Sequence, residues 1–287
     1  MGPEAPRFPR SRDLGGLDGP VLAFGGVLSN LDALHALFAE AARLGIGAER
    51  MICTGDVAGY GAEPEECLAL LRERRIAAVL GNVEESLARD ADDCGCNFVE
   101  GSTCDALSGT WYGYARARVS DDSRAWMRAT PRAITFRMGG HALTVVHGGL
   151  RHISRYVFAS DTDALADEVA ALGRPGAIIA GHCGIPFSRR AGGTLWHNPG
   201  ALGLPANDGT PRVWYSLVTA EGAGLRFIHQ ALAYDHAGAA AKMRKAGLPE
   251  AYARALETGL WPDTAILPAP EKAATGVPLA PAAASWP

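Results

Sequence analysis

The chain has 287 residues, of which 48% are hydrophobic and 20% charged, the composition of a folded globular protein rather than a disordered or fibrous one. A formal net charge of −4 provides no global basic field that would recruit nucleic acid or an anionic membrane. No stretch approaches the roughly 20 apolar residues of a membrane-spanning helix, and prolines stand where a signal peptide needs an apolar segment, so we expect a cytoplasmic protein without nucleic-acid or membrane partners.

The first third of the chain alternates short apolar runs with amphipathic stretches. This pattern predicts strands at 19–26, 50–56 and 76–82, and helices at 29–45 and 64–74. Such alternation is typical of parallel strands joined by crossover helices. Each strand ends in glycine followed by polar residues, so we expect polar side chains to gather at the carboxyl ends of the strands, where open α/β sheets place their sites.

Residues 88–133 interrupt this alternation with three cysteines and several aromatic residues, and we interpret them as an inserted cap with one or two helices. Strand patterns then resume, several of them joined by short glycine-containing turns as in antiparallel pairs. These strands are predicted at 133–140, 141–149, 176–182, 192–200, 212–220 and 224–233. A parallel half followed by a more antiparallel half predicts an α/β fold of two packed mixed β-sheets flanked by helices.

We divide the chain into three segments. Residues 1–19 form an N-terminal extension, residues 20–235 form the main domain with its cap, and residues 236–287 form a C-terminal helix and a tail rich in proline and alanine. Six prolines fall within residues 262–287. Because proline lacks a backbone N–H and fixes φ, we expect no regular helix and no central strand in this tail.

Five sequence blocks follow one another at the ends of the predicted strands. They are TGDVAGYG at 54–61, AVLGN at 78–82, VVHGG at 145–149, AGHCGIPF at 180–187 and WHNPGALGLPANDGTPRVWYSL at 196–217. In this order and at this spacing they resemble the calcineurin-like metallophosphoesterases, especially the small bacterial members, over roughly residues 20–235. The resemblance implies an αββα sandwich and a hydrolase of the phosphatase type acting on a small phosphorylated molecule.

The chemistry of that family relies on two metals that share a bridging carboxylate, generate a hydroxide and clamp the phosphate oxygens. Four residues match its ligand positions: Asp56, Asn82, His147 and His182. The resemblance implies that they hold one divalent transition metal, Mn, Fe or Zn, because these ions accept nitrogen and oxygen ligands. One metal site is therefore expected to be complete.

The second metal site lacks its side chains. FGGVLSN replaces the family pattern DxH and puts Gly26 and Leu28 at ligand positions, while GHCG replaces GHTH and puts Gly184 at a third. GNVE replaces GNHD, so that Val83 stands at the general-acid histidine and Glu84 at the following aspartate. We therefore expect a single metal per chain and weak turnover of generic phosphate esters.

The six cysteines are expected to be free thiols or metal ligands in a reducing cytoplasm rather than disulfides. Cys94, Cys96 and Cys104 are interpreted as buried thiols, a local zinc site or thiols of the active site. We expect their segment to fold over the mouth of the site with at least one sulfur near the metal. Cys183 lies inside the GHCG block, where a thiolate would supply a soft ligand.

Further polar residues near these blocks are candidates for catalysis or substrate binding. His197 in WHNPG would line the site and replace the missing general acid, or is a surface histidine. Glu84 would serve as ligand or base, or complements the positive end of a helix. Asn30, Arg151 and Arg155 would bind phosphate, and the alternatives are a helix cap for Asn30 and solvated surface positions for the two arginines.

The leading functional hypothesis is a divergent metal-dependent phosphoesterase or hydrolase with an altered metal centre. A first alternative is a catalytically impaired pseudo-phosphoesterase that acts as a binding or regulatory module. A second alternative is a metalloenzyme of another class whose site contains cysteine. Fold by itself does not separate these alternatives.

Overall fold

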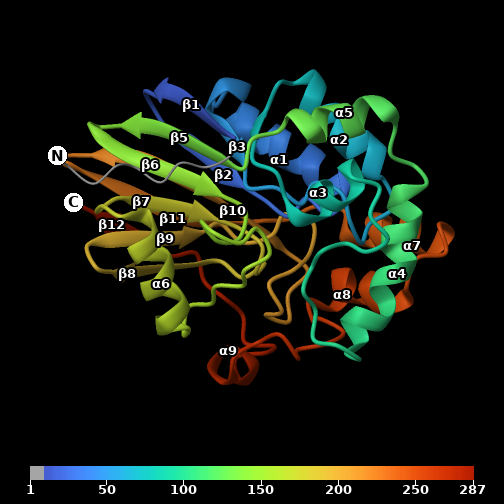
Figure 1. Ribbon diagram of the computed structural model, residues 1–287. Helices are drawn as coiled ribbons and strands as arrows, with labels where there is room; N and C mark the ends of the chain where they lie inside the picture. The colour runs from blue at the N-terminus through green and yellow to red at the C-terminus, as the bar shows by residue number, and fades with distance from the viewer. Residues whose placement is uncertain (1–9) are drawn as a thin grey trace.

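Two six-stranded mixed sheets organise residues 10–287, the part of the chain that the computed structural model describes (Figure 1). The first sheet has the order β1 (Ser11–Gly16), β5 (Ala133–Met138), β6 (His141–Val146), β7 (Ala177–Ala180), β9 (Thr194–Asn198) and β8 (Phe187–Ala191). The second has the order β12 (Ala283–Trp286), β11 (Gly224–Leu232), β10 (Val213–Glu221), β2 (Val21–Phe24), β3 (Met51–Cys53) and β4 (Ala77–Ala78). The predicted class, two mixed sheets flanked by helices, is confirmed.

The helices lie outside the sheets. They are α1 (Leu31–Arg43), α2 (Pro64–Glu73), α3 (Asn82–Ala88), α4 (Thr103–Arg116), α5 (Asp121–Ala129), α6 (Thr162–Leu172), α7 (His236–Lys245), α8 (Glu250–Thr258) and α9 (Ala269–Ala273), with a 3₁₀ turn at Ala48–Arg50. In Figure 1, α6 lies beside the first sheet, and α1, α2 and α3 lie on the side of the second.

Strand β2 shows why the layers form. Its side chains alternate, so that Val21 and Ala23 enter the core between the sheets, while Leu22 and Phe24 pack against the helical layer. All four are fully buried, as expected for a strand covered on both faces. On the helical side, the apolar stripe of α1 that includes Leu34 closes the core.

Both ends of the chain add an edge strand. Within the predicted N-terminal extension, β1 pairs in parallel with β5, and residues 1–9 lie outside the described residues. In the proline-rich tail, β12 pairs antiparallel with β11. The expectation of no regular helix in this tail is wrong for α9, where a proline sits in the first turn and removes no helical hydrogen bond. The three-segment division itself stays a prediction.

The segment 88–133 contains two helices, α4 and α5, within the range expected for the cap. Trp111 and Tyr112 of α4 are buried against the main core, and the Trp111 ring stacks on Tyr60 with ring centroids 4.6 Å apart. The cap is thus packed onto the domain through large apolar side chains. Among residues 10–287, no helix is long and apolar enough to cross a membrane.

Candidate metal centre

The four predicted ligand residues lie together at the carboxyl ends of strands from both sheets. Asp56 follows β3, Asn82 begins α3 after β4, His147 directly follows β6, and His182 follows β7. Because β3 and β4 are parallel, as are β6 and β7, their carboxyl ends meet at one edge. Asp56 and His182 adopt left-handed backbone conformations with φ of 52° and 65°, so the chain turns sharply at both ligand positions.

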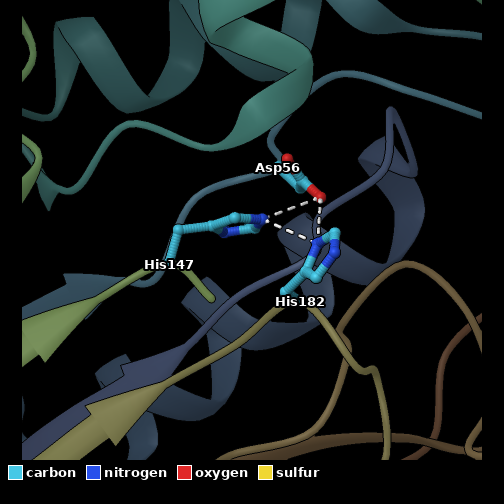
Figure 2. A group of neighbouring side chains, drawn as sticks. All are labelled: Asp56, His147 and His182. Carbon is cyan, nitrogen blue, oxygen red and sulfur yellow. Dashed lines mark hydrogen bonds and ion pairs between the residues drawn. The ribbon is translucent and has the colours of Figure 1, made fainter. Parts of the chain in front are cut away.

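Three of these side chains converge on one point (Figure 2). Ligand atoms of Asp56, His147 and His182 all lie within 4.8 Å of one another. His147 Nε2 is 3.2 Å from Asp56 Oδ2 and 3.1 Å from His182 Nδ1. Asn82 joins the group, since its Oδ1 lies 2.9 Å from His147 Nε2. Donor atoms about 2.1 Å from one ion would be separated by such distances.

The hydrogen bonds around the centre show that it presents lone pairs rather than donors. The Thr54 carbonyl oxygen can only accept, so His147 donates Nδ1–H to it over 2.7 Å and turns the lone pair of Nε2 inward. Asn82 donates its Nδ2 to the Cys94 carbonyl oxygen, which leaves Oδ1 facing His147. Together with the Asp56 carboxylate, these acceptors need a proton or a cation between them. The residues therefore fit a divalent metal.

The electrostatics of the centre favour the protonation states of metal ligands at Asp56 and His182. Burial alone would raise the pKa of Asp56, but His147 and His182 hold it well below its usual range. Burial lowers the pKa of His182. For His147 burial acts downward, but the Asp56 carboxylate outweighs it and raises the pKa. At neutral pH Asp56 is thus ionised and His182 neutral, as ligation requires, whereas a metal would displace the proton that the Asp56 carboxylate favours on His147.

Glu84 holds the loop that carries Asp56. Its buried carboxylate accepts backbone N–H groups from Asp56 (2.9 Å), Val57 (2.8 Å), Ala58 (2.9 Å) and Gly81 (3.2 Å). Burial, reinforced by the Asp56 charge, raises the pKa of Glu84 to about 7. The expectation that Glu84 is a ligand or base is corrected, because both of its oxygens serve the loop backbone. It is a positioning residue.

His197 does not join the centre, contrary to expectation. Its side chain is fully buried and is not among the residues that line the cavity beside Asp56. Its Nδ1 lies 2.8 Å from Ser188 Oγ, its Nε2 lies 2.8 Å from Ser216 Oγ, and its ring stacks on His229. A ring with both nitrogens engaged in the interior is not available to protonate a leaving group.

The pH dependence of folding tests this placement of His197. Burial lowers the pKa of His197 well below its usual value and also lowers that of His229. Below about pH 6.5 the unfolded chain therefore binds more protons than the folded chain, so the free energy of unfolding falls as the pH drops. Each histidine contributes a slope of up to about 1.4 kcal/mol per pH unit. We expect His197→Gln to remove about half of the joint contribution.

Urea unfolding at pH 7, 6 and 5 measures this slope. The matched control is His152→Gln, because His152 is exposed, and the slope of the wild type is expected to persist there. A slope equally steep in His197→Gln and the wild type would contradict the interior placement.

The predicted phosphate-binding residues lie outside the candidate metal centre and its cavity. Asn30 accepts the backbone N–H of Ala33 over 3.1 Å and donates Nδ2 to the Gly203 carbonyl oxygen, so the helix-cap interpretation holds and both ends of its amide are occupied. The Arg155 guanidinium pairs with Asp167 at 3.0 Å. Arg151 is exposed on the loop after β6. None of the three lines the cavity described below.

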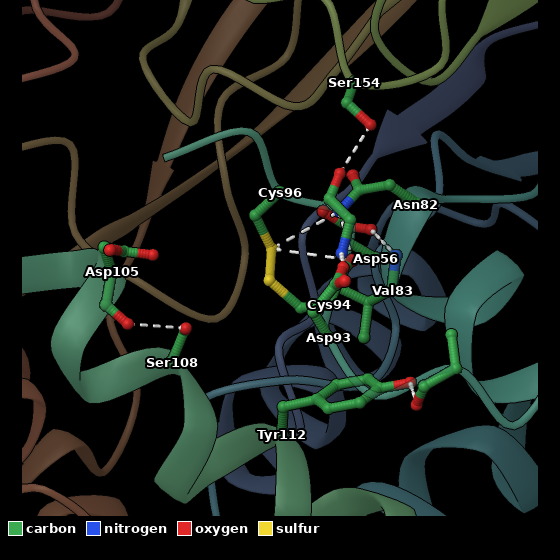
Figure 3. The surroundings of a disulfide bond; sticks show 12 residues. Asp56, Asn82, Val83, Asp93, Cys94, Cys96, Asp105, Ser108, Tyr112 and Ser154 are labelled. Carbon is green, nitrogen blue, oxygen red and sulfur yellow. Dashed lines mark hydrogen bonds between the residues drawn. A yellow bond between two sulfur atoms is a disulfide. The ribbon is translucent and has the colours of Figure 1, made fainter. Parts of the chain in front are cut away.

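Cys94 and Cys96 are joined by a disulfide, which corrects the expectation of free thiols there (Figure 3). The bridge lies against the candidate metal centre, since Asn82 Nδ2 is 3.4 Å from Cys96 Sγ. The Ser154 hydroxyl donates to the Gly95 carbonyl oxygen over 2.6 Å and ties this turn to the loop after β6. The cap thus folds over the site, and its backbone orients the Asn82 amide.

Cys183 and Cys104 lie near the site but are not part of the group of candidate metal ligands. Burial raises the pKa of Cys183 to about 12, so its thiol is protonated at neutral pH. Its sulfur accepts Asn198 Nδ2–H over 3.1 Å and does not belong to the group of candidate ligands around Asp56, so the expected soft ligand is not found there. Burial also raises the pKa of Cys104, which lies at the start of α4 on the cavity wall.

A cavity lies beside Asp56 and His182, and Gly26, Leu28 and Gly184 form part of its wall. These are the three positions at which the sequence resemblance implies missing ligands of a second metal. A Cβ atom at Gly184 would lie 3.3 Å from Cζ2 of Trp261, and one at Gly26 would lie 3.2 Å from Cβ of Ala201. Apolar groups therefore already contact both glycines.

The sequence patterns did not single out two aromatic residues of the site. Tyr156 stacks on the ring of His182 with ring centroids 4.2 Å apart, and its hydroxyl donates to the Cys96 carbonyl oxygen over 3.0 Å. Trp261 lines the cavity from the C-terminal segment. Tyr156 follows a singled-out arginine directly, and this adjacency is the only signal that pointed to it.

Comparison with known proteins agrees with this fold. The family model described as calcineurin-like phosphoesterase superfamily domain matches residues 28–223. An uncharacterized protein of Methanocaldococcus jannaschii is 26% identical over 240 residues, which cover 77% of this chain and 90% of that protein.

Two solved structures share the fold. A metallophosphoesterase from Sphaerobacter thermophilus aligns with a TM-score of 0.66 and 24% identity, covering 85% of this chain and 100% of that one. A hypothetical protein from Pyrococcus horikoshii OT3 aligns with a TM-score of 0.69 and 16% identity, covering 84% and 99%.

Proposed function

The chain belongs to the calcineurin-like phosphoesterase superfamily, and we propose that it is a single-metal phosphoesterase acting on a small phosphorylated molecule. The observation that carries this proposal is the convergence of inward-facing acceptors from Asp56, Asn82, His147 and His182. The net charge of −4 supports a small-molecule substrate rather than nucleic acid. We place the enzyme in the cytoplasm on the same sequence grounds as above.

Each residue has a defined part in this proposal. Asp56, Asn82, His147 and His182 would hold a divalent transition metal such as Mn, Fe or Zn. When bound, such a metal supplies Lewis acidity towards phosphoryl oxygens. The Thr54 carbonyl oxygen fixes the tautomer of His147.

The apolar second-metal positions favour a second candidate, a binding module that retains the metal but has lost turnover. Leu28 and Val83 provide no ligand and no acid at positions where active family members are expected to have histidine. Removing electrostatic stabilisation and general-acid assistance costs several powers of ten in rate. Measurement of turnover separates the two candidates.

We expect slow, metal-dependent hydrolysis of nitrophenyl phosphate esters by protein reloaded separately with Mn, Fe or Zn. Asp56→Asn is expected to lower the rate by about 100-fold or more, because it removes a ligand charge. Asp122→Asn changes an exposed acid on α5 and serves as the control. Equal rates with and without metal would refute the enzyme proposal, and a tightly bound metal without any turnover would favour the binding module.

A further inference from the structure

We propose that the substrate carries a flat aromatic group next to its phosphate and that this group occupies the cavity beside Asp56 and His182. This inference rests on the proposed function, because it assumes that the phosphate lies at the metal centre. It assigns the region where a second metal is missing to substrate recognition, with Trp261 as the residue that determines specificity.

The wall of the cavity is apolar away from the metal centre. Its apolar side chains come from the main domain, the cap and the C-terminal segment: Leu28, Phe98, Leu204, Trp261 and Ile266. Burying apolar surface against such a wall is favourable in proportion to the area removed from water. An apolar group attached to the phosphate therefore gains affinity here, whereas a sugar or polyol leaves hydroxyls without partners.

The aromatic walls are rigid, which favours a planar ligand group. Tyr156 is stacked on His182. Tyr60 is stacked on Trp111 and meets the edge of Tyr252 at an interplanar angle of 88°. Rings held in place by other rings lose little conformational freedom on binding.

The charges of the cavity exclude a second phosphate. Neither arginine nor lysine is present among the described residues that line it. The carboxylate on the far side, Asp263, accepts backbone N–H groups from Thr103 (2.8 Å) and Ala265 (2.8 Å). A nucleoside polyphosphate or a sugar bisphosphate would meet no positive charge there. The neutral part of a monophosphate ester fits better.

Trp261 is held in place from outside the matched family domain. It lies after α8, beyond residue 223 where the family match ends. Its Nε1–H donates to the Pro205 carbonyl oxygen over 2.6 Å, and its backbone N–H donates to Asn207 Oδ1 over 2.8 Å. The indole is thus fixed beside Gly184. It occupies the space that a side-chain ligand for a second metal would need at this position.

The test compares two non-hydrolysable probes, phenylphosphonate and methylphosphonate, which share the same phosphonate head. Isothermal titration calorimetry on metal-loaded wild type should give at least about tenfold tighter binding of the phenyl compound, which corresponds to about 1.4 kcal/mol. Trp261→Ala should reduce the ratio of the two dissociation constants to below about threefold, while the metal content and methylphosphonate affinity stay unchanged. Trp126→Ala, at a half-buried tryptophan of α5 away from the cavity, should keep the full ratio.

Ile266→Ala provides a second variant if Trp261→Ala does not fold, and it should also lower the ratio. Equal affinity of both probes for the wild type would overturn the inference and leave the single-metal proposal standing. Failure of both probes to bind the metal-loaded protein would contradict both proposals. A full ratio in Trp261→Ala would remove Trp261 from recognition.

Discussion

Joint replacement of His147 and His182 by alanine is expected to abolish metal binding. Wild type purified without added metal should carry about one transition-metal ion per chain, and the double variant less than roughly a tenth of that. The two histidines supply both nitrogen donors of the group, and their ring nitrogens lie 3.1 Å apart. The Asp56 and Asn82 oxygens that remain are too few to hold a Zn, Mn or Fe ion tightly.

Elemental analysis after dialysis against a weak chelator measures this loss. The matched control is the double variant His35→Ala and His152→Ala, since both side chains are exposed and neither belongs to the group of candidate ligands. Metal should also raise the melting temperature of the wild type but not of the His147/His182 variant, because only a bound ligand stabilises the folded state. A metal content unaffected by the joint replacement of His147 and His182 would contradict the assignment of these residues as ligands.

Replacing Glu84 by alanine is expected to be the most destabilising single change near the site, with a loss of about 3–5 kcal/mol in the free energy of unfolding. The substitution leaves four backbone N–H groups of the buried Asp56 loop and of Gly81 without their acceptor. Asp56 is held in a left-handed conformation within that loop, so metal affinity should fall with stability.

Urea unfolding of the metal-free protein measures the stability term by itself. Glu84→Gln retains one acceptor oxygen and should lose less than Glu84→Ala, whereas Glu66→Ala, at an exposed glutamate of α2, should stay within about 0.5 kcal/mol of the wild type. A loss below about 1 kcal/mol in Glu84→Ala would show that water replaces the carboxylate and that Glu84 does not fix the loop.

The sequence by itself determined the fold and the group of four polar residues. Apolar runs alternating with helical stretches require a layered sheet, and parallel strands bring their carboxyl ends to one edge. Asp56, Asn82, His147 and His182 each lie at or near the carboxyl end of a predicted strand, so their proximity follows from the order of blocks along the chain. The cap position was predictable for the same reason, because its chain leaves from the edge of the site.

Only the tertiary structure decided which side chains support the four polar residues and which candidate residues lie away from them. The direction of the Glu84 carboxylate depends on the shape of the Asp56 loop, and the burial of His197 depends on which face of β9 points between the sheets. The pairing of Cys94 with Cys96 depends on the fold of one turn against Asn82. Trp261 reaches Gly184 from a segment 77 residues further along the chain, counted as 261 − 184. A local sequence pattern indicates which side chains of a helix or strand are buried. It does not indicate which distant residues they contact, because those contacts are set by the packing of the whole chain.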